Sequence, residues 1–173
     1  MPLLSKDVIK EALMESEPVT DRDRSMAIGK TSFALLFQLA GVLLRHGPGL
    51  VLEAPFGPTS LPELSTLSRI ADTALIMCVV SADTAVSRYR ARFVAGTRHP
   101  GHQDGAVLLD LRARIESGEY DPPSLSVPTL RVDTSDGYQP PIEAVVAWIR
   151  RHHESETIRK RRSASPGPPG ESR

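Results

Sequence analysis

Apolar positions along the chain alternate between short continuous runs and longer stretches with helical spacing. Continuous apolar runs predict strands at residues 2–4, 50–53, 74–80 and 129–132. Helical spacing predicts helices at residues 7–14, 24–45, 62–70, 83–94, 104–117 and 142–151. Short strands that alternate with helices indicate βαβ units. We therefore expect an α/β fold with a mostly parallel sheet that is covered on both faces, and a strand at 74–80 that is buried on both sides.

Composition divides the chain into a body, residues 1–152, and a basic tail, residues 153–173. Apolar residues almost vanish in the tail, where a basic run from Arg159 to Arg162 is followed by Ser, Pro and Gly. Such a segment cannot bury enough apolar surface to offset its ordering entropy, so we expect it to be disordered. The basic run could contact nucleic acid or phosphorylated partners, and a solvated tail without a partner is the alternative.

Charge and cysteine content narrow the class of protein. The 21 basic residues balance the 21 acidic ones, so bulk charge points neither to nucleic acid nor to a membrane surface. The single cysteine, Cys78, excludes a disulfide within the chain and indicates a reducing compartment. No apolar run approaches the length that spans a bilayer. We expect a cytoplasmic protein without a membrane partner.

Polar residues just after the predicted strands are the first candidates for chemistry, because parallel sheets bind ligands beyond the carboxyl ends of their strands. The candidates at strand ends are Ser5, Lys6 and Asp7 with Lys10, then Glu53, and then Asp133 with Thr134. A basic segment adds Arg88, Arg90, Arg92, Arg98, His99 and His102. A carboxylate that accepts a hydroxyl proton, together with guanidinium groups that neutralise phosphoryl oxygens, suits phosphoryl transfer.

Each candidate has a plainer interpretation. Asp7 can serve as a helix N-cap, and one residue can be both cap and catalyst. Arg88 and Arg92 lie four residues apart, so they can form a solvated helix face. His99 and His102 have metal-pair spacing, but Pro-Gly between them breaks any helix that would align them, so we expect no metal site. A carboxylate that closes a buried strand, as Glu53 does, must reach solvent or a partner.

Several stretches, in order along residues 2–152, resemble the landmarks of the P-loop kinases. These are AAA-type ATP-binding proteins of the zeta-toxin, chloramphenicol phosphotransferase and polynucleotide kinase group. The stretches that carry the resemblance are Leu3 to Leu13, Val51 to Phe56, Arg88 to Arg92 with Arg98 to His102, Tyr120 to Pro122, and Val132 to Thr134. The resemblance implies a three-layer P-loop fold and an ATP- and Mg²⁺-dependent kinase that acts on a small-molecule hydroxyl.

The resemblance also implies roles for the candidate residues. Asp7 would be the general base, and Lys10 and Glu53 would bind the acceptor, Glu53 near a metal-bound water. The remaining candidates would form the lid or contact the nucleotide: Arg88, Arg92 and Arg98 on the phosphates, with Asp133 and Thr134 beside them. A non-catalytic remnant that binds an anionic ligand or a protein partner is the alternative.

The phosphate-binding loop of such kinases, G-x-x-x-x-G-K-[ST], has no match here. Gly29, Lys30 and Thr31 fit its last three positions, but Arg24 takes the place of the first glycine, and we expect a helix there. The resemblance therefore implies that the chain starts at the family's second strand, without the central first strand, and is inactive as written. Either the functional protein carries the loop upstream, or the chain is a remnant that no longer turns over ATP.

Overall fold

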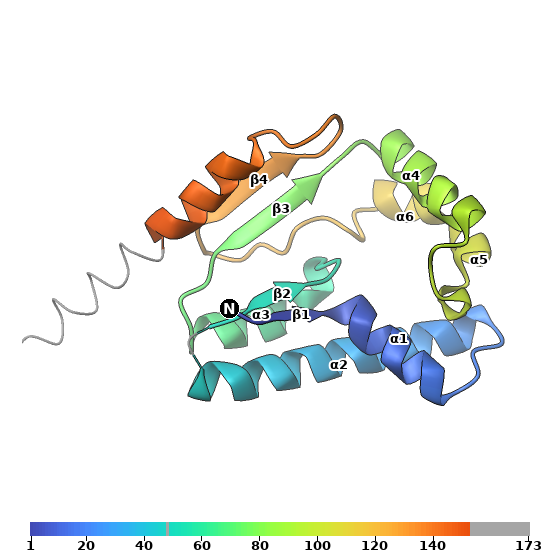
Figure 1. Ribbon diagram of the computed structural model, residues 1–173, viewed down its shortest axis with the longest axis horizontal. Helices are drawn as coiled ribbons and strands as arrows, with labels where there is room; N and C mark the ends of the chain where they lie inside the picture. The colour runs from blue at the N-terminus through green and yellow to red at the C-terminus, as the bar shows by residue number, and fades with distance from the viewer. Residues whose placement is uncertain (48, 153–173) are drawn as a thin grey trace, which may run out of the picture. The chain divides into compact units, whose positions relative to one another are not determined.

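The computed structural model describes residues 1–47 and 49–152, so the predicted tail lies outside the described residues. The chain divides into two compact units (Figure 1). The first unit comprises Met1–Thr73 and Val80–Val127. The second comprises Ala74–Val79 and the chain from Pro128 onward.

The first unit holds one pair of strands and most of the helices. Its elements are β1 (Leu3–Ser5), α1 (Lys6–Ser16), α2 (Arg22–His46), β2 (Val51–Glu53), the 3-10 turn η1 (Pro58–Ser60), α3 (Leu61–Ser68), α4 (Ala82–Ala95), the 3-10 turn η2 (Pro100–His102), α5 (Asp104–Leu108) and α6 (Leu111–Glu116). β1 pairs with β2 in parallel, and Ser5 lies opposite Glu53 in the register. The last residues of both strands therefore meet at one edge of this sheet.

The second unit is a parallel pair of strands with one helix. β3 (Leu75–Val79) pairs with β4 (Thr129–Asp133), and residues 142–152 are helical. Val132 on β4 and Val145 on the helix are 2% and 6% exposed and form the apolar centre of the unit. β3 alternates between half-buried and exposed residues, with Ile76 and Cys78 exposed. The prediction that this strand is buried on both faces is therefore wrong for the described residues.

The α/β class and the parallel pairing of the strands are confirmed. The described residues form two separate two-stranded sheets and not one continuous sheet. Each sheet joins strands that are far apart in sequence, because a parallel pair requires a long crossover connection.

Helix α2 follows from the apolar pattern at residues 24–45. The Asp21 carboxylate caps its first turn by accepting from the Arg24 amide at 2.8 Å. The buried residues, spaced three or four apart, form one stripe: Ser25, Ile28, Ser32, Leu36 and Ala40. The stripe packs against α1, and α2 also contacts α3. The helix runs unbroken through Gly29–Thr31, so this part of the chain is helical as predicted.

Helix α2 also corrects one expectation about membranes. It contains an 18-residue window of mean hydropathy 1.6, so by length and composition this helix could cross a bilayer. The expectation that no apolar stretch reaches that length is wrong for α2. Mostly buried core helices of soluble proteins pass the same test; in α2, which packs against α1 and α3 within the first unit, 22% of that window is buried.

The helix predicted at 104–117 is divided into α5 and α6. The backbone of Asp110 leaves the helical region at the junction, with φ −124° and ψ 2°. The Arg22 guanidinium holds this break, since it donates to the Asp110 carboxylate at 2.5 Å and to the Ala106 carbonyl at 3.4 Å. A tertiary contact from α2 therefore coincides with the division, and helical periodicity alone carries no sign of it.

Candidate active site

Three polar side chains of the first unit meet around the Arg98 guanidinium. Arg98 Nη2 donates to Asp7 Oδ2 at 2.6 Å, and Nη1 donates to Asp104 Oδ1 at 3.1 Å. The Tyr89 hydroxyl donates to the same Asp104 oxygen at 2.6 Å. We call Asp7, Tyr89, Arg98 and Asp104 the Arg98 cluster. Its members come from α1, α4, the following loop and α5.

Asp7 reaches the cluster from the first turn of α1, directly after β1. The N-cap of α1 is Ser5, and Ser5 makes no capping hydrogen bond with its side chain. The Ser5 hydroxyl instead donates to Glu53 Oε2 at 2.6 Å. The alternative interpretation of Asp7 as the helix N-cap is therefore wrong: Asp7 lies within the first turn, and its carboxylate joins the Arg98 cluster.

The loop between α4 and α5 turns back onto α1. Gly96 ends α4 in the left-handed region at φ 60°, where glycine has no steric cost. Gln103 adopts φ 56° just before α5, which is uncommon for a residue other than glycine. These two reversals bracket the segment that carries Arg98, His99 and His102.

Three carboxylates on α1 face this segment. Asp7, Glu11 and Glu15 are spaced four residues apart, so they share one face of the helix. Besides the Asp7–Arg98 pair, His102 Nε2 lies 2.8 Å from Glu11 Oε1, and His99 Nε2 lies 3.4 Å from Glu15 Oε1. The loop therefore docks on α1 through three acid–base pairs.

Two buried lysines lie beside Asp7. Lys6 Nζ donates to Asp7 Oδ1 at 3.0 Å, and Lys10 Nζ donates to Ser25 Oγ at 2.9 Å. Lys6 is 9% and Lys10 7% exposed, which is rare for lysine. Burial and the neighbouring Lys6 lower the pKa of Lys10 to about 8. Lys10 can therefore bind an anion as an ammonium near neutral pH, and lose its proton more readily than an exposed lysine.

Burial and charge act against each other in the pKa values of the cluster. Burial favours the neutral acid of Asp7, but Lys6 and Arg98 outweigh it and lower its pKa. Burial disfavours the charged guanidinium, but Asp7 and Asp104 raise the pKa of Arg98. Burial and the hydrogen bond to Asp104 raise the pKa of Tyr89. At neutral pH the Arg98 cluster therefore holds a carboxylate, a guanidinium and a protonated phenol.

Three of the residues singled out from the sequence lie together, namely Asp7, Lys10 and Arg98. Asp7 contacts Arg98 directly, and both Asp7 and Arg98 act electrostatically on Lys10. Glu53 lies at the edge where β1 and β2 end and accepts from Ser5. These positions make one edge of the β1–β2 sheet the candidate active site.

Of the other predicted residues, Arg92 borders the Arg98 cluster, and Asp133 and Thr134 lie in the second unit. The Arg92 guanidinium stacks on the Tyr89 ring at 5.0 Å from its centroid, next to the Arg98 cluster. Arg88 lies on the same helix and has an interaction partner of its own. Asp133 and Thr134 belong to the second unit, where Asp133 Oδ1 accepts from the Ser135 amide at 2.8 Å and the Thr134 hydroxyl donates to the Val79 carbonyl at 3.1 Å.

Tyr89, Asp104 and Glu11 are site residues that sequence reasoning missed, whereas Lys6 belongs to the candidate stretch at the end of the first predicted strand. The spacing of Asp7, Glu11 and Glu15 was the available signal for a docking face on α1. Tyr89 and Asp104 had no such signal, because each becomes notable only through its contact with Arg98. Among residues 1–47 and 49–152, no group of three or more His, Cys, Asp or Glu side chains is placed to hold a metal ion.

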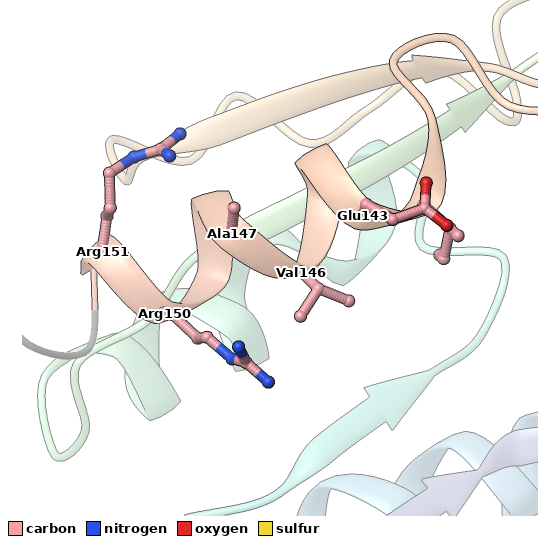
Figure 2. Close-up of a pocket in the computed structure, with 6 residues that line it drawn as sticks. Glu143, Val146, Ala147, Arg150 and Arg151 are labelled. Atoms are coloured by element: carbon pink, nitrogen blue, oxygen red, sulfur yellow. The ribbon is translucent and has the colours of Figure 1, made fainter.

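The second unit has a shallow hollow along its helix (Figure 2). The side chains that line it are Ile142, Glu143, Val146, Ala147, Arg150 and Arg151. All of them come from successive turns of one helix, as Figure 2 shows. None is a candidate from the sequence, and the hollow gathers no acid–base pair like that of Asp7 and Arg98.

Comparison with known proteins defines the class. The fold is of the kinase-like α/β kind, and the candidate site combines a carboxylate with cations that suit phosphate. The chain matches a crystal structure from Chloroflexus aurantiacus J-10-fl, described as a "putative kinase", with a TM-score of 0.72 and 34% sequence identity. The match covers 88% of this chain and 84% of that one. The chain therefore belongs to the family of this kinase-like protein. No protein-family model and no curated protein matches the chain.

Proposed function

We propose that the protein is a phosphotransferase of the P-loop kinase type that moves the γ-phosphoryl group of ATP to a hydroxyl on a small molecule. The observation that carries the proposal is the contact between Asp7 and Arg98 after the first strand of the β1–β2 sheet. The relative described as a "putative kinase" supports the same class of reaction.

Asp7 is suited to accept the hydroxyl proton. Its lowered pKa keeps it ionised at neutral pH, and its side chain is 42% exposed, so an acceptor hydroxyl can reach it. A low pKa makes Asp7 a weak base, but phosphoryl transfer with a loose transition state depends mainly on positioning and charge stabilisation. In this proposal Arg98 supplies charge stabilisation, since its guanidinium can bind the oxygens of the transferred group.

The residues near Asp7 fit the phosphates of ATP. The first unit supplies two ammonium groups, from Lys6 and Lys10, and the guanidinium of Arg98. Groups of these kinds are suited to phosphate oxygens. Mg²⁺ in nucleotide enzymes is bound through one or two carboxylates and the substrate phosphates. Glu53, beside the Ser5 hydroxyl, would hold Mg²⁺, and the metal would neutralise the charge of the phosphates.

A second candidate is a non-catalytic module that binds an anionic ligand or a protein partner. Two observations favour it. Asp7 already contacts two cations, Lys6 and Arg98. Gly29–Thr31, which match the end of a phosphate-binding loop, lie inside α2 and expose no free amides of a loop. Such a module would still bind an anion through Lys10 and Arg98.

Transfer of ³²P from γ-labelled ATP to a panel of hydroxylated small molecules tests the two functions. In a longer form of the protein that carries the phosphate-binding loop upstream, we expect labelling of an acceptor, and Asp7→Asn in that form should abolish labelling while nucleotide binding, measured by calorimetry, survives. Asp23→Asn removes an exposed acid from α2 and serves as the matched control. Unchanged labelling by Asp7→Asn would exclude Asp7 as the base. Binding of ATP without labelling of any acceptor would favour the non-catalytic module.

A further inference from the structure

Asp104 is a buried carboxylate whose partners are both in the Arg98 cluster. Its side chain is 7% exposed, and its Oδ1 accepts from the Tyr89 hydroxyl at 2.6 Å and from Arg98 Nη1 at 3.1 Å. A buried carboxylate is costly unless hydrogen bonds and an opposite charge compensate it. Tyr89 and Arg98 supply that compensation, so the three side chains hold one another in place.

The two terminal nitrogens of Arg98 bind different carboxylates. Nη1 faces Asp104, while Nη2 faces Asp7. A guanidinium is planar and its donors form a rigid fork, so fixing one nitrogen fixes the direction of the other. The Asp104 contact therefore determines where Arg98 Nη2 points.

Tyr89 reinforces this arrangement from a second side. Its hydroxyl also lies 3.4 Å from Arg98 Nη1, and the Arg98 guanidinium carbon lies 5.9 Å from the centre of the Tyr89 ring. The ring of Tyr89 also stacks under Arg92. Helix α4 thus presents one aromatic side chain that contacts both Arg98 and Asp104.

We propose that Tyr89 and Asp104 are positioning residues that hold the Arg98 guanidinium against Asp7. The proposal goes beyond the proposed function by assigning two residues to the same site, and its catalytic consequence rests on that function. Asp104 fixes Nη1, Tyr89 fixes Asp104, and Nη2 is thereby aimed at the Asp7 carboxylate and at a phosphoryl group beside it. Neither residue touches the reacting atoms.

The alternative is that Tyr89 and Asp104 only stabilise the fold by linking α4 and α5 to the Arg98 loop. The pKa of Asp7 distinguishes this structural role from the positioning role. Removing the Asp104 charge would by itself lower the pKa of Asp7, since a like charge nearby disfavours ionisation. If Asp104 holds Arg98 in place, its loss releases the cation from Asp7 and raises the pKa of Asp7. The two roles therefore predict shifts of opposite sign for Asp104→Asn.

The experiment measures the Asp7 carboxyl pKa by ¹³C NMR in the intact protein. We expect Asp104→Asn and Tyr89→Phe to raise it, and Tyr120→Phe, a tyrosine stacked on Arg114 in the same unit, to leave it unchanged. Tyr89→Phe keeps the ring and the charge, so it remains informative if Asp104→Asn does not fold. A lower pKa in Asp104→Asn, or an unchanged pKa in Tyr89→Phe, would overturn the proposal.

Kinetics separate this inference from the proposed function. If the protein transfers phosphate, Tyr89→Phe should lower kcat on the order of tenfold to a hundredfold with little change in the KM for ATP, the effect of a misplaced group. An equal fall in kcat for Tyr120→Phe would contradict a positioning role for Tyr89. If no acceptor is labelled, the proposed function fails, while the pKa of Asp7 still decides whether Tyr89 and Asp104 position Arg98.

Discussion

Arg98 Nη2 lies 2.6 Å from Asp7 Oδ2, although 91 positions separate the two residues in the sequence. The contact joins the first turn of α1 to the loop that follows α4. It is part of a docking face on which Asp7, Glu11 and Glu15 meet Arg98, His102 and His99. This loop therefore lies directly against the candidate base, and Arg98 contacts its carboxylate.

A double-mutant cycle tests the Asp7–Arg98 contact. We expect Asp7→Ala and Arg98→Ala to be coupled by about 1 kcal/mol in the free energy of unfolding, a value between exposed and buried ion pairs. The value is modest because the Asp7 side chain is 42% exposed, so solvent screens the pair. Urea denaturation of the four proteins measures the coupling. Additive effects within about 0.3 kcal/mol, as for independent sites, would contradict the contact.

Lys10 should titrate well below an ordinary lysine. Burial and Lys6 lower its pKa to about 8 from 10.5, so the folded protein binds fewer protons than the unfolded chain between these values. The contribution of Lys10 to stability therefore rises as pH increases through this window. NMR of the lysine Cε–Hε groups measures the pKa, and Lys10→Arg identifies the signal by its loss. A Lys10 signal that titrates near 10.5 would contradict a buried ammonium.

His102 should lose its proton more readily than a free histidine. Burial lowers the pKa of His102, and the positive charges of Arg98 and Lys10 lower it further. The hydrogen bond to Glu11 and the charge of Asp7 act in the opposite direction, but the net shift is downward. Because the folded-state pKa lies below 6.5, His102 makes the protein less stable as pH falls through that range.

The partner of His102 can be tested directly. Glu11→Gln should lower the pKa of His102 further, because it removes the hydrogen bond that raises it. Glu15→Gln removes the partner of His99 one turn along α1 and is the matched control. NMR of the His102 imidazole gives both values. A larger change with Glu15→Gln than with Glu11→Gln would show that the pairing along α1 is different.

Two glycines should respond in opposite directions to alanine. A Cβ at Gly57 would lie 2.3 Å from the Glu119 carbonyl oxygen, and a Cβ at Gly41 in α2 would meet nothing within 4 Å. We expect Gly57→Ala to lower the free energy of unfolding by roughly 1–3 kcal/mol through overpacking. Gly41→Ala should raise it by about 0.5–1 kcal/mol, because alanine favours a helix interior. Urea denaturation compares them, and equal effects would contradict the close approach at Gly57.

Local patterns were sufficient for the long helix and the strands of this fold, but not for the division between α5 and α6. The long helix near 24–45 and the strands near 50–53, 74–80 and 129–132 lie within a few residues of α2, β2, β3 and β4. Periodicity predicts such elements because the spacing of apolar residues within one short segment shows whether that segment buries a helix stripe or a strand. Parallel pairing followed as well, since strands separated by helices can pair in parallel through crossovers.

The choice of Asp7, Lys10 and Arg98 as candidates also came from the chain alone, from residue type and position after a strand. Their partners depended on tertiary structure. Ser5, and not Asp7, is the N-cap of α1, because its position is set by where β1 ends. Tyr89 and Asp104 meet Arg98 only after the chain reverses at Gly96 and Gln103.

Residue types and periodicity therefore identified the strands, the helices and the charged groups suited to phosphoryl transfer. Which of these charges pair with each other was decided by the loop between α4 and α5, which brings Arg98, His99 and His102 against α1. Periodicity describes interactions over a few residues, whereas the contact of Arg98 with Asp7 spans 91 positions. Only the three-dimensional arrangement of the first unit brings those side chains within hydrogen-bonding distance.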